Sequence, residues 1–141
     1  MTTAHDVVSD LLEELAASRV TLRRDVPGVS AFPVVEEALT PGTGSLRGET
    51  TVDLPTQPVV LEIQAGRQVV QDDSRSAYDD PAFQQMLDTY GGLAAQIVTP
   101  VMVDGRLVAI LSVHQLGATR SWKSEEIDTA SRAAARIGEL S

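Results

Sequence analysis

The sequence predicts a single α/β domain, and three observations lead to this fold class. The 141 residues match the commonest length of one domain, so we expect residues 1–141 to share one hydrophobic core. Segments with helical and with strand periodicity alternate along the chain. The strongest local pattern is at residues 93–116, where two apolar runs flank Asp104-Gly105, a dipeptide suited to the two-residue turn of a β-hairpin.

The N-terminal region predicts a helix followed by a strand. Apolar residues recur every three or four positions from Thr3 to about Ser18, and Thr3 with Asp6 fits an N-terminal cap, which indicates an amphipathic helix. Residues 19–25 alternate polar and apolar side chains up to Pro27-Gly28. This alternation is typical of a strand with one buried and one solvated face.

Residues 32–56 predict a short helix and then a long loop. Pro33 stands where a first helical turn tolerates proline, so we expect a short helix over residues 32–39. Gly, Thr and Pro are frequent over residues 40–56, which favours a loop that could close over a site, with at most a short strand over residues 50–53.

The rest of the chain predicts three further helices around a strand and the hairpin. Residues 58–65 fit a helix or a strand and end at Gly66, a helix C-cap signal, and residues 67–71 resume a strand. Asp80-Pro81 predicts the start of a helix. The last helix is expected from Ser124 to about Leu140.

Composition excludes several classes of partner and site. The formal net charge of −9 and the pI near 4.5 oppose binding to nucleic acid. No apolar run approaches the length of a membrane helix and the N-terminus lacks a signal-peptide pattern, so we expect a cytoplasmic location and no membrane contact. The absence of cysteine excludes disulfides, thiolate metal sites and thiol catalysis.

Three stretches together resemble the GAF domain family over essentially the whole chain. Residues 61–73, LEIQAGRQVVQDD, resemble the family's helix, glycine turn, strand and closing acidic residue. Residues 100–113, PVMVDGRLVAILSV, resemble its central hairpin, and residues 120–127, RSWKSEEI, resemble the Arg-x-Trp entry to its final helix. The resemblance implies a central antiparallel sheet, with the first and last helices on one face and a ligand pocket under loops and short helices on the other.

The resemblance also allows the family's known chemistries to be compared with this sequence. Bilin attachment and methionine sulfoxide reduction in GAF domains require cysteine, which this chain lacks. Cyclic-nucleotide-binding members often carry an Asn-Lys-Phe-Asp-Glu constellation, and this chain contains no asparagine. We therefore predict no cofactor, and the identity of a small-molecule ligand stays open.

Strand alternation in the hairpin points to candidate ligand-binding residues. Counting outward from Asp104-Gly105 places Thr99 opposite Ile110 and puts Thr99, Ser112 and His114 on one face. We expect this face to line the pocket, because buried polar groups need partners that a ligand can supply. A structural histidine bonded to neighbouring groups, or a haem or metal ligand, is the alternative for His114.

Other candidates have structural explanations beside the functional ones. Tyr78, Phe83 and Tyr90 lie where the family's pocket wall would be, and they fit either ligand contact or core packing. Trp122 is expected to anchor the last helix. Four aspartates lack the spacing of a calcium loop, and with only two histidines present no metal site is predicted (Asp72, Asp73, Asp79, Asp80).

These observations favour a non-catalytic sensory or regulatory module that binds a small molecule and signals through a dimer or a partner protein. Ser112 and His114 stand side by side on one strand without an oxyanion hole or an orienting acid, so no catalytic residues are predicted. The alternative is a ligand-independent homodimerisation module that uses the first and last helices, since the Ala-rich segment 130–135 permits close helix approach.

Overall fold

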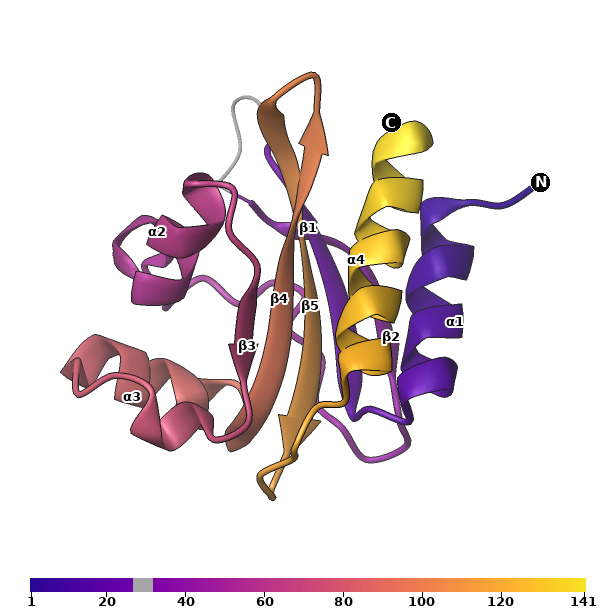
Figure 1. The fold of residues 1–141 in the computed structure, drawn as a ribbon. Helices are drawn as coiled ribbons and strands as arrows, with labels where there is room; N and C mark the ends of the chain where they lie inside the picture. Colours follow the sequence, from indigo (N-terminus) through magenta and orange to yellow (C-terminus); the bar gives the residue numbers. More distant parts are fainter. Residues whose placement is uncertain (27–31) are drawn as a thin grey trace.

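The computed structural model describes residues 1–26 and 32–141, which form an antiparallel sheet between two layers of helices (Figure 1). The helices are α1 (Ala4–Leu15), α2 (Pro58–Gln64), α3 (Pro81–Thr89) and α4 (Ser124–Glu139), with the short 3-10 helices η1 (Leu54–Thr56) and η2 (Ser74–Ser76). The strands are β1 (Arg19–Arg24), β2 (Val34–Leu39), β3 (Val69–Gln71), β4 (Leu93–Val103) and β5 (Arg106–Leu116). They are ordered β2-β1-β5-β4-β3 in one antiparallel sheet, which confirms the predicted α/β fold with a central antiparallel sheet.

Helices α1 and α4 cover one face of the sheet, as predicted (Figure 1). The predicted cap of α1 is confirmed, because the Asp6 amide donates to the Thr3 hydroxyl and the Thr3 amide donates to the Asp6 carboxylate. Ala130 and Ala134 pack inward on the sheet, so these two residues are occupied within the chain and do not offer a seam to a second copy. No described helix is long and apolar enough to cross a membrane.

Helices α2 and α3 lie on the opposite face of the sheet (Figure 1). The ambiguous residues 58–65 are helical, and Gly66 follows with a φ of 81°, as the C-cap signal predicted. Asp80 caps α3 by accepting the amides of Ala82 at 2.8 Å and Phe83 at 3.1 Å. This second layer is shorter than the first and leaves space against the sheet.

The hairpin turns at Asp104-Gly105, whose φ angles of 52° and 75° confirm the predicted two-residue turn. The register differs from the count along the sequence. Met102 pairs with Leu107, but Val101 pairs with Ala109, so Val108 is an extra residue in β5. This β-bulge moves the pairs from Val101 to Ala95 by one position, and Thr99 lies opposite Leu111 instead of Ile110.

The predicted short helix over residues 32–39 is wrong, because residues Val34–Leu39 form the edge strand β2. Pairing with β1 overrides the helical propensity of this segment, and Pro33 lies just before the strand. Residues 50–53 form no strand, and η1 follows them directly. The predicted stop at Pro27-Gly28 lies outside the described residues.

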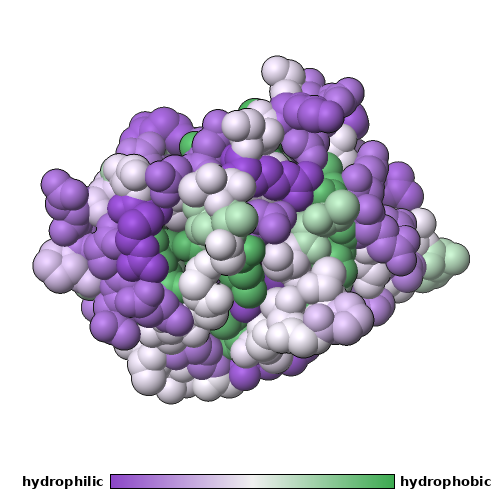
Figure 2. All heavy atoms as spheres, turned by 90° about the horizontal axis from the view of Figure 1, so that it is seen from below, coloured by the Kyte–Doolittle hydropathy of each residue, from purple (hydrophilic) through white to green (hydrophobic). Residues whose placement is uncertain are grey.

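Strand β1 also differs from the expected half-solvated strand, since five of its six residues are buried. It lies between β2 and β5, so both of its edges are paired and both of its faces are covered. Figure 2 shows one end of the molecule, which is mainly hydrophilic with apolar residues visible in recesses near its centre.

Candidate functional site

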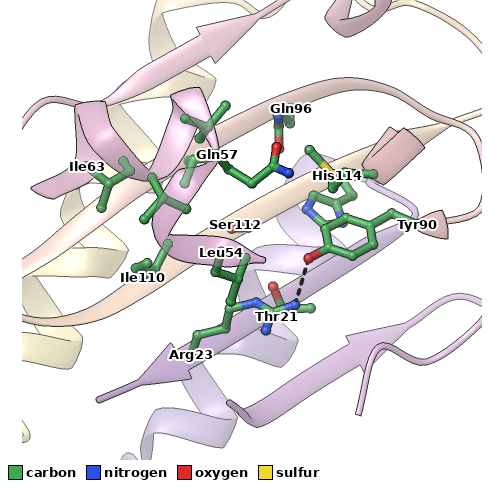
Figure 3. A pocket seen from close by; sticks show the side chains of 14 residues that line it. Thr21, Arg23, Leu54, Gln57, Ile63, Tyr90, Gln96, Ile110, Ser112 and His114 are labelled. Carbon is green, nitrogen blue, oxygen red and sulfur yellow. Dashed lines mark hydrogen bonds between the residues drawn. The ribbon is translucent and has the colours of Figure 1, made fainter. Parts of the chain in front are cut away.

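A small cavity lies between the sheet and the layer formed by η1, α2 and α3 (Figure 3). Its volume is about 50 Å³, roughly the volume that one or two water molecules occupy in liquid water. Polar residues of the sheet and apolar residues of the helices meet there. The lining residues are Thr21, Arg23, Leu54, Gln57, Val59, Val60, Ile63, Met86, Tyr90, Gln96, Val98, Ile110, Ser112 and His114.

Strand β1 supplies polar residues that sequence reasoning missed. Arg19, Thr21 and Arg23 alternate with Val20 and Leu22, which pack in the core beneath α1 and α4. The three polar residues therefore share the opposite face. They pair across to neighbours on the same face of β5, namely His114, Ser112 and Ile110. The alternation was visible in the sequence, but it predicted a solvated face instead of a cavity wall.

Arg19 is almost completely buried and holds three parts of the site together. Its Nε donates to Nδ1 of His114 at 3.0 Å, and its two terminal nitrogens donate to the Gly44 carbonyl at 2.9 Å and the Tyr90 carbonyl at 2.7 Å. Burial lowers the pKa of Arg19 to about 10, so the guanidinium stays charged at neutral pH. All three acceptors are uncharged.

His114 is a neutral imidazole whose tautomer follows from its partner. A guanidinium can only donate, so Nδ1 must be an acceptor and the ring proton sits on Nε2. Burial, and then the positive charges of Arg19 and Arg23, hold the pKa of His114 well below 6.5. The ring stacks on Tyr90 with a centroid separation of 5.9 Å. The site therefore presents an N–H donor here.

Arg23 and Tyr90 form a second pair at the cavity wall. Arg23 donates to the Tyr90 hydroxyl at 3.1 Å and to the Phe32 carbonyl at 3.1 Å, and only 7% of its surface is exposed (Figure 3). Burial raises the pKa of Tyr90, so the phenol keeps its proton. Since the phenolic oxygen accepts from Arg23, its own hydrogen is directed to another group.

Two polar atoms at the cavity have no hydrogen-bond partner among the residues that the structure describes. They are the Thr21 hydroxyl oxygen, on the sheet, and Oε1 of Gln57, at the start of α2. The amide nitrogen of Gln57 reaches the Ala82 carbonyl at 3.4 Å. A buried polar atom without a partner costs roughly 1–3 kcal/mol, so a ligand or water that satisfies both atoms would be stabilised here.

The structure places three of the six predicted site residues at the cavity and three elsewhere. Ser112, His114 and Tyr90 line it. Thr99 does not: the bulge at Val108 turns Thr99 to the other face of the sheet, where its hydroxyl accepts from Gln68 at 3.0 Å. Thr99 is therefore excluded from this cavity, because one shifted pair inverts the face of a strand residue.

Tyr78 and Phe83 pack against each other instead of lining the cavity. Their rings meet edge to face with centroids 5.0 Å apart, and Phe83 is fully buried in the core between α3 and the sheet. Trp122 is also buried, and its indole N–H donates to the Gln71 carbonyl at 3.1 Å. Asp72 accepts the Trp122 amide at 3.2 Å. These contacts anchor the start of α4 to β3.

A larger outer cleft adjoins the cavity, with a volume of about 440 Å³. Arg23 and Leu54 line both spaces. Leu54 is half-buried in the single turn of η1, so one short segment separates the cavity from the cleft. The other residues of the outer cleft are Phe32, Pro33, Val34, Leu46, Gly48, Glu49, Thr50, Val52, Asp53 and Pro55.

The arrangement suits binding more than catalysis. Ser112 makes no hydrogen bond to His114 among the described residues, and the Nδ1 lone pair that could accept a proton is used by Arg19. Within residues 1–26 and 32–141, no three acidic or imidazole side chains gather as a metal site requires. What the cavity offers is a set of hydrogen-bond donors facing an apolar wall.

Comparison with known proteins gives a GAF domain both by sequence and by fold. The GAF domain family matches residues 2–139. Among solved structures, the GAF domain of the cyanobacteriochrome TePixJ is 24% identical with a TM-score of 0.81, covering 95% of this chain and 83% of that one. GAF3 of Slr1393 from Synechocystis sp. PCC6803, in its photoproduct state, is 18% identical with a TM-score of 0.76, covering 96% and 91%.

A third similar structure is the far-red absorbing dark state of JSC1_58120g3 with bound biliverdin IXα. It is 16% identical with a TM-score of 0.79, covering 99% of this chain and 90% of that one. At these identities the likeness shows the fold alone. No curated protein matches the sequence.

Proposed function

We propose that this chain, which belongs to the GAF domain family, is a non-catalytic sensory domain that binds a small molecule in the cavity beneath α2. The observation that carries this proposal is the pair of unpartnered polar atoms on opposite walls, Thr21 Oγ1 and Gln57 Oε1. Buried polar groups in folded proteins are normally satisfied. A bound molecule that bridges the sheet and α2 would satisfy both of them.

A bilin, the chromophore of the similar photoreceptor GAF domains, does not fit this site. The chain has no cysteine to which a tetrapyrrole could be attached. The cavity of about 50 Å³ is also far below the several hundred Å³ that even a drug-sized ligand occupies. The proposed ligand is therefore smaller than a bilin, or it extends into the outer cleft past Leu54.

The signal would leave through the helical layer behind the sheet. Strand β1 contributes to the cavity wall on one face and to the core beneath α1 and α4 on the other. A groove between these helices is bordered by acidic residues of α1 and basic residues of α4, among them Asp10, Glu14, Arg132 and Arg136. This mixed charge is suited to contact with a second copy or with a partner protein.

Ligand screening tests the proposal directly. Thermal shift and native mass spectrometry across a metabolite library should give at least one binder that raises the melting temperature. Ser112→Leu, which fills the cavity, should abolish the response, whereas Thr99→Val on the opposite face should keep it. A library without any binder, or a binder equally active on Ser112→Leu, would contradict the proposal.

Light scattering separates this function from ligand-independent dimerisation. A sensor that signals by assembly should change its oligomeric state, or its affinity for a partner, when the ligand found in the screen is added. A dimer that forms at micromolar concentration and ignores every binder would favour the dimerisation module instead.

A further inference from the structure

We infer that the cavity takes the carboxylate of a small organic acid, bound at Arg23 and the Tyr90 hydroxyl with its apolar part against η1 and α2. This inference rests on the proposed ligand-binding function and specifies the class of ligand. Three sets of observations lead to it: two buried arginines without a carboxylate in contact, the surplus of donors at the wall and the apolar lining opposite them.

The charge of the site is unbalanced. Arg19 and Arg23 are 1% and 7% exposed, and within residues 1–26 and 32–141 neither forms a salt bridge with a carboxylate. Glu37 and Glu49 are near enough for their charges to act on Arg19 and Arg23, but neither carboxylate contacts a guanidinium, and both are hydrogen-bonded to other groups. Glu37 accepts from Ser45 and the Leu46 amide, and Glu49 accepts from Thr51 and the Val52 amide.

Buried charges without a counter-charge are expensive, and natural proteins normally pair them. The bonds that Arg19 and Arg23 make to carbonyls, a phenol and an imidazole reduce this cost but leave two positive charges together. An anion beside Arg23 would compensate both charges. A neutral ligand of the same shape would not.

The groups able to donate hydrogen bonds at the wall outnumber the acceptors there. Arg23, Tyr90 and His114 border the same space (Figure 3), and the Tyr90 hydroxyl and the Nε2 of His114 each carry a hydrogen to donate. The hydroxyls of Thr21 and Ser112 add two more groups able to donate. The side-chain amide oxygens at this space are fewer: Gln57 Oε1, which has no partner among the described residues, and Gln96 Oε1. A carboxylate has two oxygens that accept and none that donates, which fits this surplus.

The wall formed by η1, α2 and α3 indicates the chemistry of the part of the ligand beyond its carboxylate. Leu54 of η1 and four residues of α2 and α3 present an apolar surface (Val59, Val60, Ile63 and Met86). This side suits a short aliphatic chain or a single ring and opposes a second charged group. A polyanion such as phosphate would gain one guanidinium but would bury excess negative charge against these side chains.

The dimensions set the size range of the acid. The cavity alone admits only the carboxylate and the first carbon atoms of such a molecule. Displacement of Leu54 would join it to the outer cleft of about 440 Å³, and Arg23 already faces both spaces. Acids of about four to eight carbon atoms could then place the carboxylate at Arg23 and the tail along η1.

Calorimetry with matched acids and amides tests the inference on the wild-type chain. The probes are butyrate, hexanoate and benzoate, with butyramide, hexanamide, benzamide and inorganic phosphate for comparison. At least one acid should bind about 10- to 100-fold more tightly than its amide, as expected for hydrogen bonds to a charged group in a buried site. Equal affinity of every acid and its amide would overturn the inference, as would phosphate binding more tightly than all three acids.

Variants locate the effect at Arg23. Arg23→Gln should remove the acid's advantage over its amide, and Arg23→Lys, which keeps the charge without the planar fork, should retain part of it. Arg67→Gln is the matched control, because Arg67 pairs with Glu62 on the surface outside both spaces. An acid advantage that survives in a folded Arg23→Gln chain would contradict the assignment.

Failure of this inference is distinguishable from failure of the proposed function. If none of the three acids binds at millimolar concentration while the metabolite screen yields a neutral binder that Ser112→Leu abolishes, the ligand class is wrong and the sensory function stands. If neither the acids nor the library bind, both are contradicted. Circular dichroism of each variant shows whether the fold is intact.

Discussion

His114 makes the stability of the fold depend on pH. The folded state holds the pKa of this ring well below 6.5, whereas the unfolded chain protonates it near the ordinary value. Unfolding therefore takes up a proton as the pH falls below about 6.5, and the folded state loses stability there. Wild type should lose about 1 kcal/mol of unfolding free energy per pH unit between about pH 6 and pH 5 through this ring.

Urea denaturation between about pH 7 and pH 5 measures this effect against two variants. His114→Gln lacks the titrating ring and should lose less unfolding free energy over the interval than wild type does. Thr99→Val changes a buried residue on the opposite face without altering a titratable group and should keep the wild-type dependence. Parallel curves for wild type and His114→Gln would show that the ring is protonated in the folded state.

Arg120 connects three elements of the fold through its guanidinium group. It donates to the Leu15 carbonyl, to Gln115 and to Glu126, and its guanidinium lies 4.3 Å from the centroid of the Trp122 ring. It thus joins the end of α1, the end of β5 and the start of α4. A lysine would keep the charge but could not reach all of these groups.

We expect Arg120→Lys to lower the unfolding free energy by about 1–2 kcal/mol and Arg120→Ala by more. Chemical denaturation measures both values. Arg132→Lys, on the exposed face of α4, serves as the control for an arginine without these contacts. If Arg120→Lys matches wild type, the charge alone accounts for the role of this residue.

At the scale of elements, the hairpin turn makes a clear prediction. Gly105 has a φ of 75°, and a Cβ added there would meet no atom within 4 Å, so backbone strain is the only penalty for a side chain. Gly105→Ala should lower the unfolding free energy by about 1–2 kcal/mol. Asp104→Asn, which tolerates the same conformation, should change it little. Thermal unfolding of both variants tests the pair, and an unchanged Gly105→Ala would mean that the turn has another form.

The elements also show what local sequence could predict. Caps and turn residues placed α1, α3 and the hairpin correctly, because their signals lie within a few residues. The edge strand β2 was predicted as a helix because its conformation depends on pairing with β1. The residues of β2 themselves carry no sign of this pairing. Thr99 was placed on the wrong face because one extra residue, Val108, has no signature in the sequence.

Some residues of the candidate site could likewise be predicted from the sequence and others could not. Strand alternation predicted Ser112 and His114 and the family resemblance predicted Tyr90, and all three line the cavity, but Arg19, Thr21, Arg23 and Gln57 were not predicted. An arginine in an alternating strand looks like a solvated residue until the sheet order shows that β1 is interior. Sequence reasoning therefore found the polar side of β5 and missed its partner strand.

At the scale of the molecule, charge is distributed unevenly. The chain has a formal net charge of −9, and two of its cations are buried at the site, so the surface is more negative than the total suggests. Like charges on the surface repel one another, and salt screens this repulsion. Raising NaCl from about 0.05 M to about 0.5 M should raise the melting temperature by roughly 2–5 °C. A lower melting temperature at high salt would indicate that attractive surface pairs dominate instead.

The two faces of strand β1 connect the candidate site directly to the helical layer behind the sheet. Its odd-numbered residues hold the polar groups of the site, while Val20 and Leu22 bear on the helices that reach the opposite surface. Between a ligand at Arg23 and the helical layer there is a single thickness of peptide backbone. A displacement of β1 by the ligand would reach the helices directly, because the residues at the site and those beneath the helices belong to the same strand.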